Sequence, residues 1–281
     1  MLNKIFVMLN KKLYILLIFI FILGATSFKP LYEMNNEEID LLIKDLVKQK
    51  KSTISKIEFF SEISKGTPYK LGPLGEGSTG KYDKNPLINF KEVDCMTFCE
   101  QILSLSISSN YDEMFKNLQK IRYKNGKISM ETRNHYPVAD WLPNNSWLIK
   151  DATIDIGKNL CSETTRVISH KKFFESKGYK DIKNITPDRT ITTKYIPKDK
   201  LKYIKNDLKS GDIVVFIQNK PGIFTSHMGL IIKNNKNIIF RHASMKEKCV
   251  TDLDFDELII YLSKKKENIG LKFFRLIFIE D

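Results

Sequence analysis

The sequence predicts an α+β fold in which N-terminal helices pack on an antiparallel β-sheet. Two observations support this fold class. Four helix-like patterns lie between residues 35 and 123, and β-rich runs separated by turn residues fill most of the last third of the 281-residue chain. Because segregated helices and strands form one layered core instead of alternating βαβ units, we expect residues 28–281 to form a single domain.

The N-terminal segment, residues 1–27, has the pattern of an export signal. Lys4, Lys11 and Lys12 precede the uncharged run LYILLIFIFILGA, which small residues follow. This order of basic, apolar and small segments is typical of a secretory signal peptide. The run is shorter than the roughly 20 residues of a spanning helix, but residues 5–9 are apolar too, so an uncleaved membrane anchor is the alternative. We therefore expect an exported protein of the periplasm, the cell envelope or the extracellular space.

Four segments predict the helices of the N-terminal half. NNEEIDLLIKDLVKQ combines an asparagine cap, early acids and apolar residues at helical spacing, and STISKIEFFSEISKG ends at Gly66. These two form a helical N-terminal extension. A loop rich in glycine and proline, GTPYKLGPLGEGSTGKYDKNP, leads to a third helix over residues 95–108, and YDEMFKNLQKIRY predicts a fourth.

The middle of the chain is predicted to be a long insertion between the third helix and the sheet. KISMET predicts a strand, RNHYPVADWLPNNSW an irregular segment, HKKFFESKG a short helix and RTITTKYIP another strand. The last third is more regular. GDIVVFIQ, HMGLIIK, NIIFRHAS and LKFFRLIFIE predict strands, and DFDELIIYLSKK predicts a helix before the last of them.

The basic composition favours an anionic partner. The formal net charge is +13, which suits a membrane surface, a cell wall or a nucleic acid. The lysines are spread along the whole chain without an arginine cluster or an aromatic-basic stripe, which argues against nucleic-acid binding. The four cysteines are too few for a disulfide scaffold, although export permits any of three pairings among them.

The main chemical signal is Cys95, which directly follows Asp94 at the predicted start of an apolar helix. A helix N-terminus favours a thiolate, so Cys95 is a candidate nucleophile. The alternative, a small core residue, is our interpretation of Cys99 one turn later. A nucleophilic cysteine needs a base from elsewhere in the fold. His227 and His242 lie on predicted strands joined by the turn NNKN, so His227 can act as the base and His242 can hold its tautomer.

The other two histidines are less suited to this role. His135 lies in the irregular RNHY segment, and His170 begins a charged helix, where we expect a surface residue. A structural role is the alternative for either strand histidine as well. The argument therefore depends on the combination of one cysteine and two paired histidines.

Four short motifs resemble the NlpC-type branch of the papain-like cysteine peptidases, which act on bacterial peptidoglycan. They are DC at a helix start, GDIVVF, SHMGLII and RHAS, in that order. The resemblance implies that Cys95 is the nucleophile, His227 the base and His242 the orienting residue. It also implies a place near the nucleophile for Tyr69 in GTPYKLG, because a tyrosine before a glycine-rich loop recurs in the superfamily.

Other motifs depart from the compact NlpC-type pattern. DCMTF replaces the usual Asp-Cys-Ser-Gly, and the chain between Cys95 and His227 is much longer. PLGEG, DCMTF, RNHY, DW and DATIDIG instead resemble the N-acetylmuramoyl-L-alanine amidase-like branch, which splits the amide between the lactyl group of muramic acid and L-alanine. This resemblance implies peptidoglycan or a muropeptide as the substrate.

The implied mechanism is an acyl transfer that needs no metal or other cofactor. The Cys95 thiolate attacks the amide carbonyl, and the backbone N–H of Cys95, with the Tyr69 hydroxyl, stabilises the oxyanion. Asn and Arg side chains suit sugar hydroxyls and peptide carboxylates, and Trp suits a sugar ring. The candidate substrate contacts are Glu76, Thr97, Arg133, Asn134 and Trp141. The alternative is that these residues hold the loops and the insertion together.

Three rival functions remain open at this point. A zinc site could use Cys95, Cys99, His227 and His242 as tetrahedral ligands, although C-x-x-x-C is not the tight C-x-x-C knuckle. An endopeptidase that cuts at γ-D-glutamyl would keep the cysteine mechanism and change the bond. An exported wall-binding protein with an inactive site would not be an enzyme.

Overall fold

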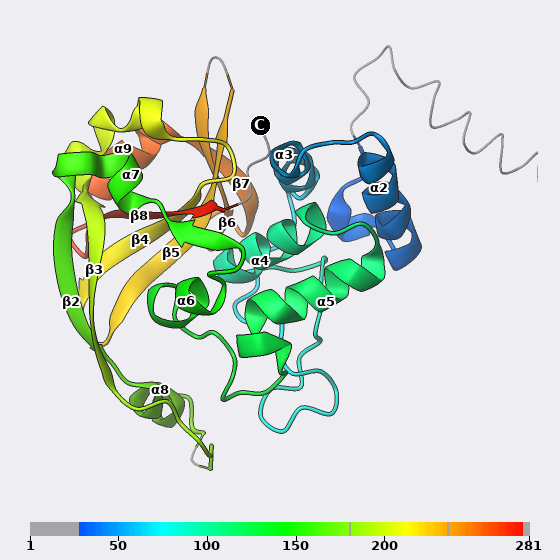
Figure 1. Ribbon diagram of the computed structural model, residues 1–281, viewed down its shortest axis with the longest axis horizontal. Coiled ribbons are helices and arrows are strands. Elements are labelled where there is room, and N and C mark those ends of the chain that lie inside the picture. The colour runs from blue at the N-terminus through cyan, green and yellow to red at the C-terminus, as the bar shows by residue number, and fades with distance from the viewer. Residues whose placement is uncertain (1–27, 180, 235–236, 278–281) are drawn as a thin grey trace, which may run out of the picture.

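The chain folds into a group of helices packed against an antiparallel sheet, which confirms the α+β fold class (Figure 1). The computed structural model describes residues 28–179, 181–234 and 237–277. The predicted export signal, residues 1–27, lies outside the described residues. Among the described helices, none combines the length and the apolar character that crossing a bilayer requires.

The four predicted N-terminal helices are confirmed. They are α2 (Asn36–Lys48), α3 (Thr53–Ile63), α4 (Cys95–Ser106) and α5 (Tyr111–Arg122). Each begins at a side-chain cap, as the start of α2 illustrates. There the Asn35 side chain accepts from the N–H of Glu38, and the Glu38 side chain accepts from the N–H of Asn35. This reciprocal pair satisfies two of the backbone donors that a helix start leaves unpaired.

The sheet has the strand order β2-β3-β8-β4-β5-β6-β7, and β1 also pairs with β8. All pairings among the described strands are antiparallel. The strands are β1 (Ile149–Asp151), β2 (Ser162–Ile168), β3 (Arg189–Pro197), β4 (Ile213–Lys220), β5 (Ile223–Lys233), β6 (Ile238–Ser244), β7 (Cys249–Asp254) and β8 (Asn268–Leu276). The short helices around it are α6 (Leu142–Asn144), α7 (Thr153–Gly157), α8 (His170–Ser176) and α9 (Phe255–Ser263).

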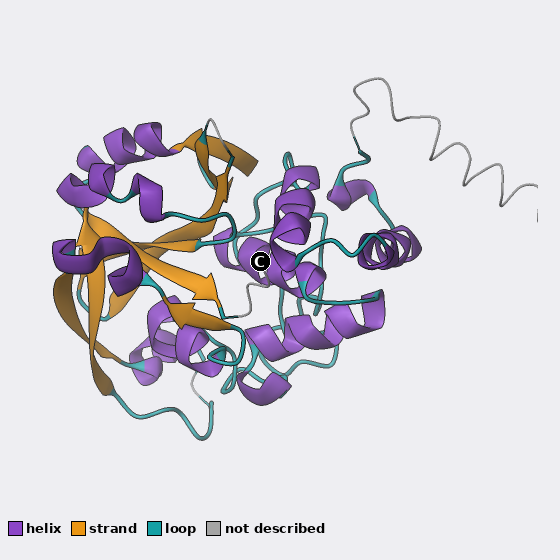
Figure 2. Ribbon diagram, turned by 45° about the horizontal axis from the view of Figure 1, so that its top comes forward, coloured by secondary structure: helices purple, strands orange, loops and turns teal. Residues whose placement is uncertain are grey.

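Helices lie on both sides of the sheet (Figure 2), and an apolar core cluster fills each side. On one face, Ile57 of α3 and Leu103 of α4 are buried with Val215 and Leu230 of the central strands. On the other face, Leu258 of α9 is buried among aromatic side chains of β4, β6 and β8. The central strands β4 and β5 therefore read as nearly continuous apolar runs, because both of their faces are covered.

The insertion is not separate from the sheet. Its strands β2 and β3 pair with one another, and β3 joins β8 through Ile196 opposite Leu271 and Pro197 opposite Gly270. A Cβ atom on Gly270 would lie 2.1 Å from the carbonyl oxygen of Ile196, so only glycine permits this approach. The insertion thus widens the sheet at one edge.

Two expectations for the insertion are wrong. KISMET forms turns instead of a strand, because the carbonyl of Ser129 accepts from the N–H groups of Thr132 and Arg133 at 3.2 and 3.0 Å. The segment expected to be irregular contains a π-helical turn, Pro137–Trp141, that continues into α6. The side chain of Asn145 closes it by donating to the Trp141 carbonyl at 2.9 Å. Local hydrogen bonds thus decide both segments: backbone bonds turn the chain at KISMET, and the Asn145 side chain closes the helical turn.

Candidate active site

Cys95 is the first residue of α4, and Asp94 is its cap. The Oδ1 atom of Asp94 accepts from the N–H of Met96 at 3.1 Å and from that of Thr97 at 2.8 Å. The Thr97 hydroxyl accepts in return from the N–H of Asp94 at 2.9 Å. This capping box holds Cys95 at the N-terminal end of the helix, as the sequence predicts.

The glycine-rich loop, residues 66–86, is tied to the same helix start. The second carboxylate oxygen of Asp94 accepts from the N–H of Gly72 at 3.0 Å. Upstream, the N–H of Tyr69 donates to the Lys248 carbonyl at 2.9 Å, which attaches the loop beside β7. Burial, with smaller contributions from the nearby Cys95 and Asp94, raises the pKa of Tyr69 to about 12. The phenol therefore lies in the electrostatic surroundings of Cys95 and stays protonated.

His227 and His242 meet through their rings. His227 Nε2 lies 2.7 Å from His242 Nδ1, so one of these nitrogens donates and the other accepts. The ring of His242 stacks on Phe240, with centroids 4.7 Å apart, and the ring of His227 lies edge-on to Phe216 at 5.2 Å. These contacts restrict both imidazoles. The prediction that β5 and β6 bring them together is confirmed.

Cys95 reaches β5 at a place where this strand separates from β6. The pairing of these strands ends at Leu230 opposite Arg241, whereas β4 stays paired with β5 beyond His227. The backbone N–H of Met228 is therefore not used by β6, and it lies close enough to the sulfur of Cys95 to lower the pKa of the thiol. Because Met228 directly follows His227, the thiol lies close to the backbone of the strand that carries this histidine.

The resting site is uncharged at neutral pH. Burial raises the pKa of Cys95 to about 12, Asp94 adds to this effect, and the N–H groups of Met228, Met96 and Cys95 oppose it. Burial also lowers the pKa of His227 to about 3, with a further contribution from His242, and lowers that of His242 to about 4. The expectation of a resting thiolate is therefore not met, because burial outweighs the helix N-terminus. A neutral imidazole is suited to accept a thiol proton during attack.

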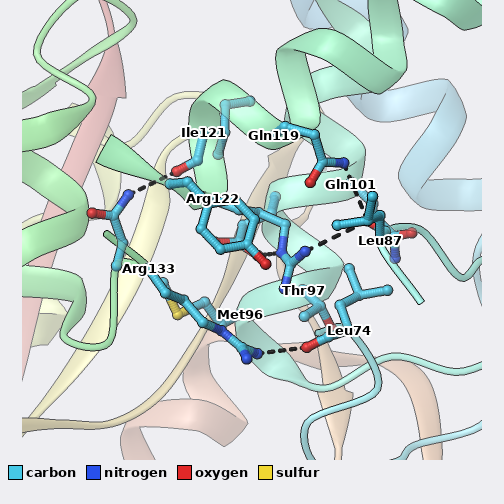
Figure 3. A network of polar contacts seen from close by, with 12 residues as sticks. Leu74, Leu87, Met96, Thr97, Gln101, Gln119, Ile121, Arg122 and Arg133 are labelled. Carbon is cyan, nitrogen blue, oxygen red and sulfur yellow. Dashed lines mark hydrogen bonds and ion pairs between the residues drawn. The ribbon is translucent and has the colours of Figure 1, made fainter. Parts of the chain in front are cut away.

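Two of the predicted substrate contacts hold the glycine-rich loop. The Glu76 carboxylate accepts from the N–H groups of Tyr82 and Asp83 at 3.2 and 3.0 Å. Arg133 pairs with Asp83 at 2.7 Å and donates to the Leu74 carbonyl at 2.6 Å (Figure 3). Their polar atoms thus have partners within the protein, which corresponds to the alternative of a loop-holding role.

Three further predicted contacts are buried in the interior. Thr97 serves the cap of α4, and Asn134 donates to the Ile121 carbonyl at 3.0 Å. Trp141 is 0% exposed, so its ring has no face open to a sugar, and the proposed platform role is wrong. Its indole instead lies near the buried Glu100.

The remaining cysteines and histidines occupy other places. Cys99 is fully buried, as expected of a packing residue, and all four cysteines are unpaired. The expectation that His170 lies on the surface is wrong. His170 is 3% exposed, and its Nε2 atom lies 2.8 Å from the carboxylate of Asp140. This buried contact, which Arg189 completes from β3, holds the insertion together.

Several residues of the site are not evident from sequence patterns. The hydroxyl of Tyr123 donates to the Gly75 carbonyl at 2.7 Å, and Arg122 of the same helix end reaches the Leu87 carbonyl (Figure 3). Arg122 also lies 3.4 Å from Glu100, whose pKa burial raises to about 7. A glutamate within an otherwise apolar helix was the one sequence signal for this buried pair. Within the described part of the chain, no three His, Cys, Asp or Glu side chains converge as a metal site, so the zinc alternative has no geometric support.

The fold and site define a class of protein that comparison with known proteins identifies. The chain belongs to the AmiA-like family, described as N-acetylmuramoyl-L-alanine amidase-like, whose family model matches residues 59–270. The matched region includes the capped cysteine and both strand histidines. No curated protein sequence matches the chain.

Solved structures resemble the chain over most of its length. A protein from Legionella pneumophila is 26% identical with a TM-score of 0.74, over 86% of this chain and 94% of its own. An N-acetylmuramoyl-L-alanine amidase from Bacteroides uniformis is 26% identical with a TM-score of 0.64, over 82% and 99%. A putative xylanase from Bacteroides fragilis is 28% identical with a TM-score of 0.61, over 79% and 99%.

Proposed function

We propose that this protein is an exported cysteine hydrolase of the NlpC-type, papain-like kind. It cleaves the amide between N-acetylmuramic acid and L-alanine in peptidoglycan or in released muropeptides. The observation that carries the proposal is the placement of Cys95 at a capped helix start next to β5, the strand on which His227 pairs with His242. Membership of the amidase-like family and the likeness to the Bacteroides uniformis amidase support the choice of bond.

The proposed reaction begins with the attack of Cys95 on the amide carbonyl. His227 accepts the thiol proton as the carbon–sulfur bond forms, and His242 holds the His227 ring through the 2.7 Å contact. Asp94 occupies the N–H groups of Met96 and Thr97, while the N–H of Cys95 faces its own sulfur and is placed to donate to the oxyanion.

The reaction ends with hydrolysis of the acyl-enzyme. His227 gives its proton to the leaving amine of L-alanine, which breaks the carbon–nitrogen bond and leaves the muramyl lactyl group on Cys95 as a thioester. His227 then takes a proton from water, whose oxygen attacks the thioester and releases the free carboxylate and the thiol. The same neutral imidazole thus serves as acceptor in both half-reactions.

The decisive experiment is digestion of a MurNAc-tripeptide by the wild type and by Cys95→Ala, with the fragments identified by mass. Cys99→Ala is the matched control, because Cys99 lies one turn further along α4 and is fully buried in the core. Free tripeptide plus MurNAc from the wild type and from Cys99→Ala, but not from Cys95→Ala, is the expected result. Fragments cut after D-Glu would move the bond to the γ-D-glutamyl endopeptidase. Equal cleavage by Cys95→Ala would refute the cysteine mechanism.

A further inference from the structure

A groove of about 760 Å³ lies at the open end of the insertion, away from any residue assigned to the chemistry. Its walls come from β2, from α8 and from the hairpin that joins β4 to β5, and Figure 1 shows α8 beyond the ends of β2 and β3. We call it the insertion groove. The argument uses six of its lining residues: Tyr136, Arg166, Lys172, Phe173, Lys220 and Ile223.

The insertion groove carries positive charge that the protein does not neutralise. Its lining includes Arg166, Lys172 and Lys220 and no Asp or Glu. In the part of the chain that the structure describes, none of these three cations forms an ion pair with a carboxylate. Lys172 and Lys220 are exposed, so their ammonium groups are available to a ligand.

Arg166 is a fixed cation, unlike the two lysines. Its guanidinium donates to the carbonyls of Lys220, Thr165 and Gln218 and to the side chains of Thr164 and Asn219, at 2.7–3.2 Å. All of these acceptors are neutral, so the guanidinium is held rigidly while its charge remains uncompensated. A fixed charge with two mobile donors around it suits an anion.

The rest of the lining is apolar. Tyr136 is 8% exposed and its ring lies 5.7 Å from that of the half-buried Phe173. Ile223, the first residue of β5, adds another apolar side chain to the lining. A groove with an apolar wall and converging cations suits a peptide with free carboxylates better than a neutral sugar chain. In the proposed substrate, the free carboxylates belong to the stem peptide, because the lactyl carboxyl of muramic acid forms the amide that is cleaved.

The groove lies within reach of the site along a single strand. Ile223 lines the groove, and Met228, whose N–H contacts the Cys95 sulfur, follows five residues later on β5. Five residues of strand span roughly 17 Å. An extended peptide of five residues spans about the same length. The two places are therefore separated by the length of one peptide stem.

We propose that the insertion groove binds the stem peptide of the substrate through its free carboxylates. The proposal rests on the proposed function, since it assigns a subsite for the same substrate. In it Lys172 and Lys220 contact the carboxylates, Arg166 supplies fixed charge, and the apolar wall packs against the peptide. The groove thereby selects acidic stem peptides and holds the L-alanine amide at Cys95.

The test separates peptide binding from cleavage by using the Cys95→Ala protein. Calorimetry measures its affinity for the free pentapeptide stem and for the same peptide with every carboxylate converted to a carboxamide. Adding Lys172→Ala and Lys220→Ala together should weaken binding of the acidic peptide at least tenfold. The carboxamide peptide should bind as weakly to either protein. Lys171→Ala, on the same helix but outside the groove lining, is the matched control and should leave the affinity unchanged.

The outcomes are distinguishable from those of the cleavage experiment. In the active enzyme, the double variant should raise KM for MurNAc-pentapeptide with little change in kcat, whereas a general folding defect would lower kcat as well. Equal affinity of the double variant, or equal affinity for the carboxamide peptide, would overturn the assignment even if the amidase activity is confirmed. Binding of inorganic phosphate but not of the peptide would overturn it too. If the peptide binds as expected and no bond is cut, the groove assignment holds and the proposed function fails.

Discussion

Asp94 should affect both the stability of the protein and the reactivity of Cys95, and two substitutions separate its contacts. Asp94→Asn keeps the Oδ1 acceptor for Met96 and Thr97 but places an amide donor opposite the N–H of Gly72. Asp94→Ala removes both sets of hydrogen bonds. The pair therefore distinguishes the helix cap from the attachment of the glycine-rich loop.

The magnitudes follow from the bonds that each substitution loses. A hydrogen bond to a charged group contributes about 1.5–3 kcal/mol, so Asp94→Asn should lower the free energy of unfolding by about that amount. Loss of a cap costs roughly 0.5–2 kcal/mol, which Asp94→Ala should lose in addition. Urea unfolding followed by circular dichroism measures both differences. Equal stability of Asp94→Asn and the wild type would show that the contact with Gly72 contributes nothing.

The same substitutions should lower the pKa of Cys95. The Asp94 carboxylate raises that pKa by disfavouring a second negative charge beside it, although burial is the larger cause. Removing the carboxylate should therefore increase the rate of iodoacetamide alkylation at a fixed pH in both variants, and the pH dependence of that rate should shift downward. Slower alkylation in both would refute the electrostatic reasoning and show that order at the helix start matters more.

Three further predictions concern the histidines and the loop. His227→Ala should lower kcat about 10²–10⁴-fold, because it removes the proposed base. His242→Ala should lower kcat at least about tenfold but by less than His227→Ala, because it only releases the base from its orientation. Steady-state kinetics of both variants check this order, and equal losses would show that His242 does more than orient His227. Burial lowers the pKa of His227 to about 3 and that of His242 to about 4, so the unfolded chain binds more protons than the folded protein between about pH 3 and 6.5. The free energy of unfolding should therefore fall as the pH drops below about 6.5, by at most about 1.4 kcal/mol per pH unit for each histidine. Urea unfolding at pH 7 and pH 5 measures this dependence, which should be shallower in His242→Gln. Arg133→Met should leave Asp83 and the Leu74 carbonyl without this partner and lower the free energy of unfolding by about 1–3 kcal/mol. Limited proteolysis should then cut the glycine-rich loop faster. An unchanged cleavage rate would mean that the loop is held by its other contacts.

Much of the local structure could be predicted from the sequence because its causes are local. Asn35 and Asp94 are caps whose partners lie within three residues, so the starts of α2 and α4 are evident from the chain alone. The apolar runs of β4 and β5 and the turn after β5 likewise predict that His227 and His242 come together. The resemblance of the short motifs to known hydrolases pointed to the same three residues.

Other features were decided by contacts between distant parts of the chain. Asn134 and Trp141 looked like surface residues of a polar segment, but α5 and the sheet cover them. His170 looked exposed in a charged helix, but Asp140, 30 residues away, pairs with it in the interior. A single sequence cannot show which polar residues gain a buried partner, because that partner comes from another element.

The charge state of the candidate catalytic groups was also decided only by the tertiary structure. The sequence determined that a capped cysteine begins a helix and that two histidines lie on adjacent strands. Whether the thiol is ionised depends on how far the surrounding elements exclude water, and here burial raises the pKa of Cys95 and lowers that of His227. The sequence thus determined which groups are available for chemistry, while packing around them decided their charge, because desolvation depends on the whole fold and not on neighbours in the chain.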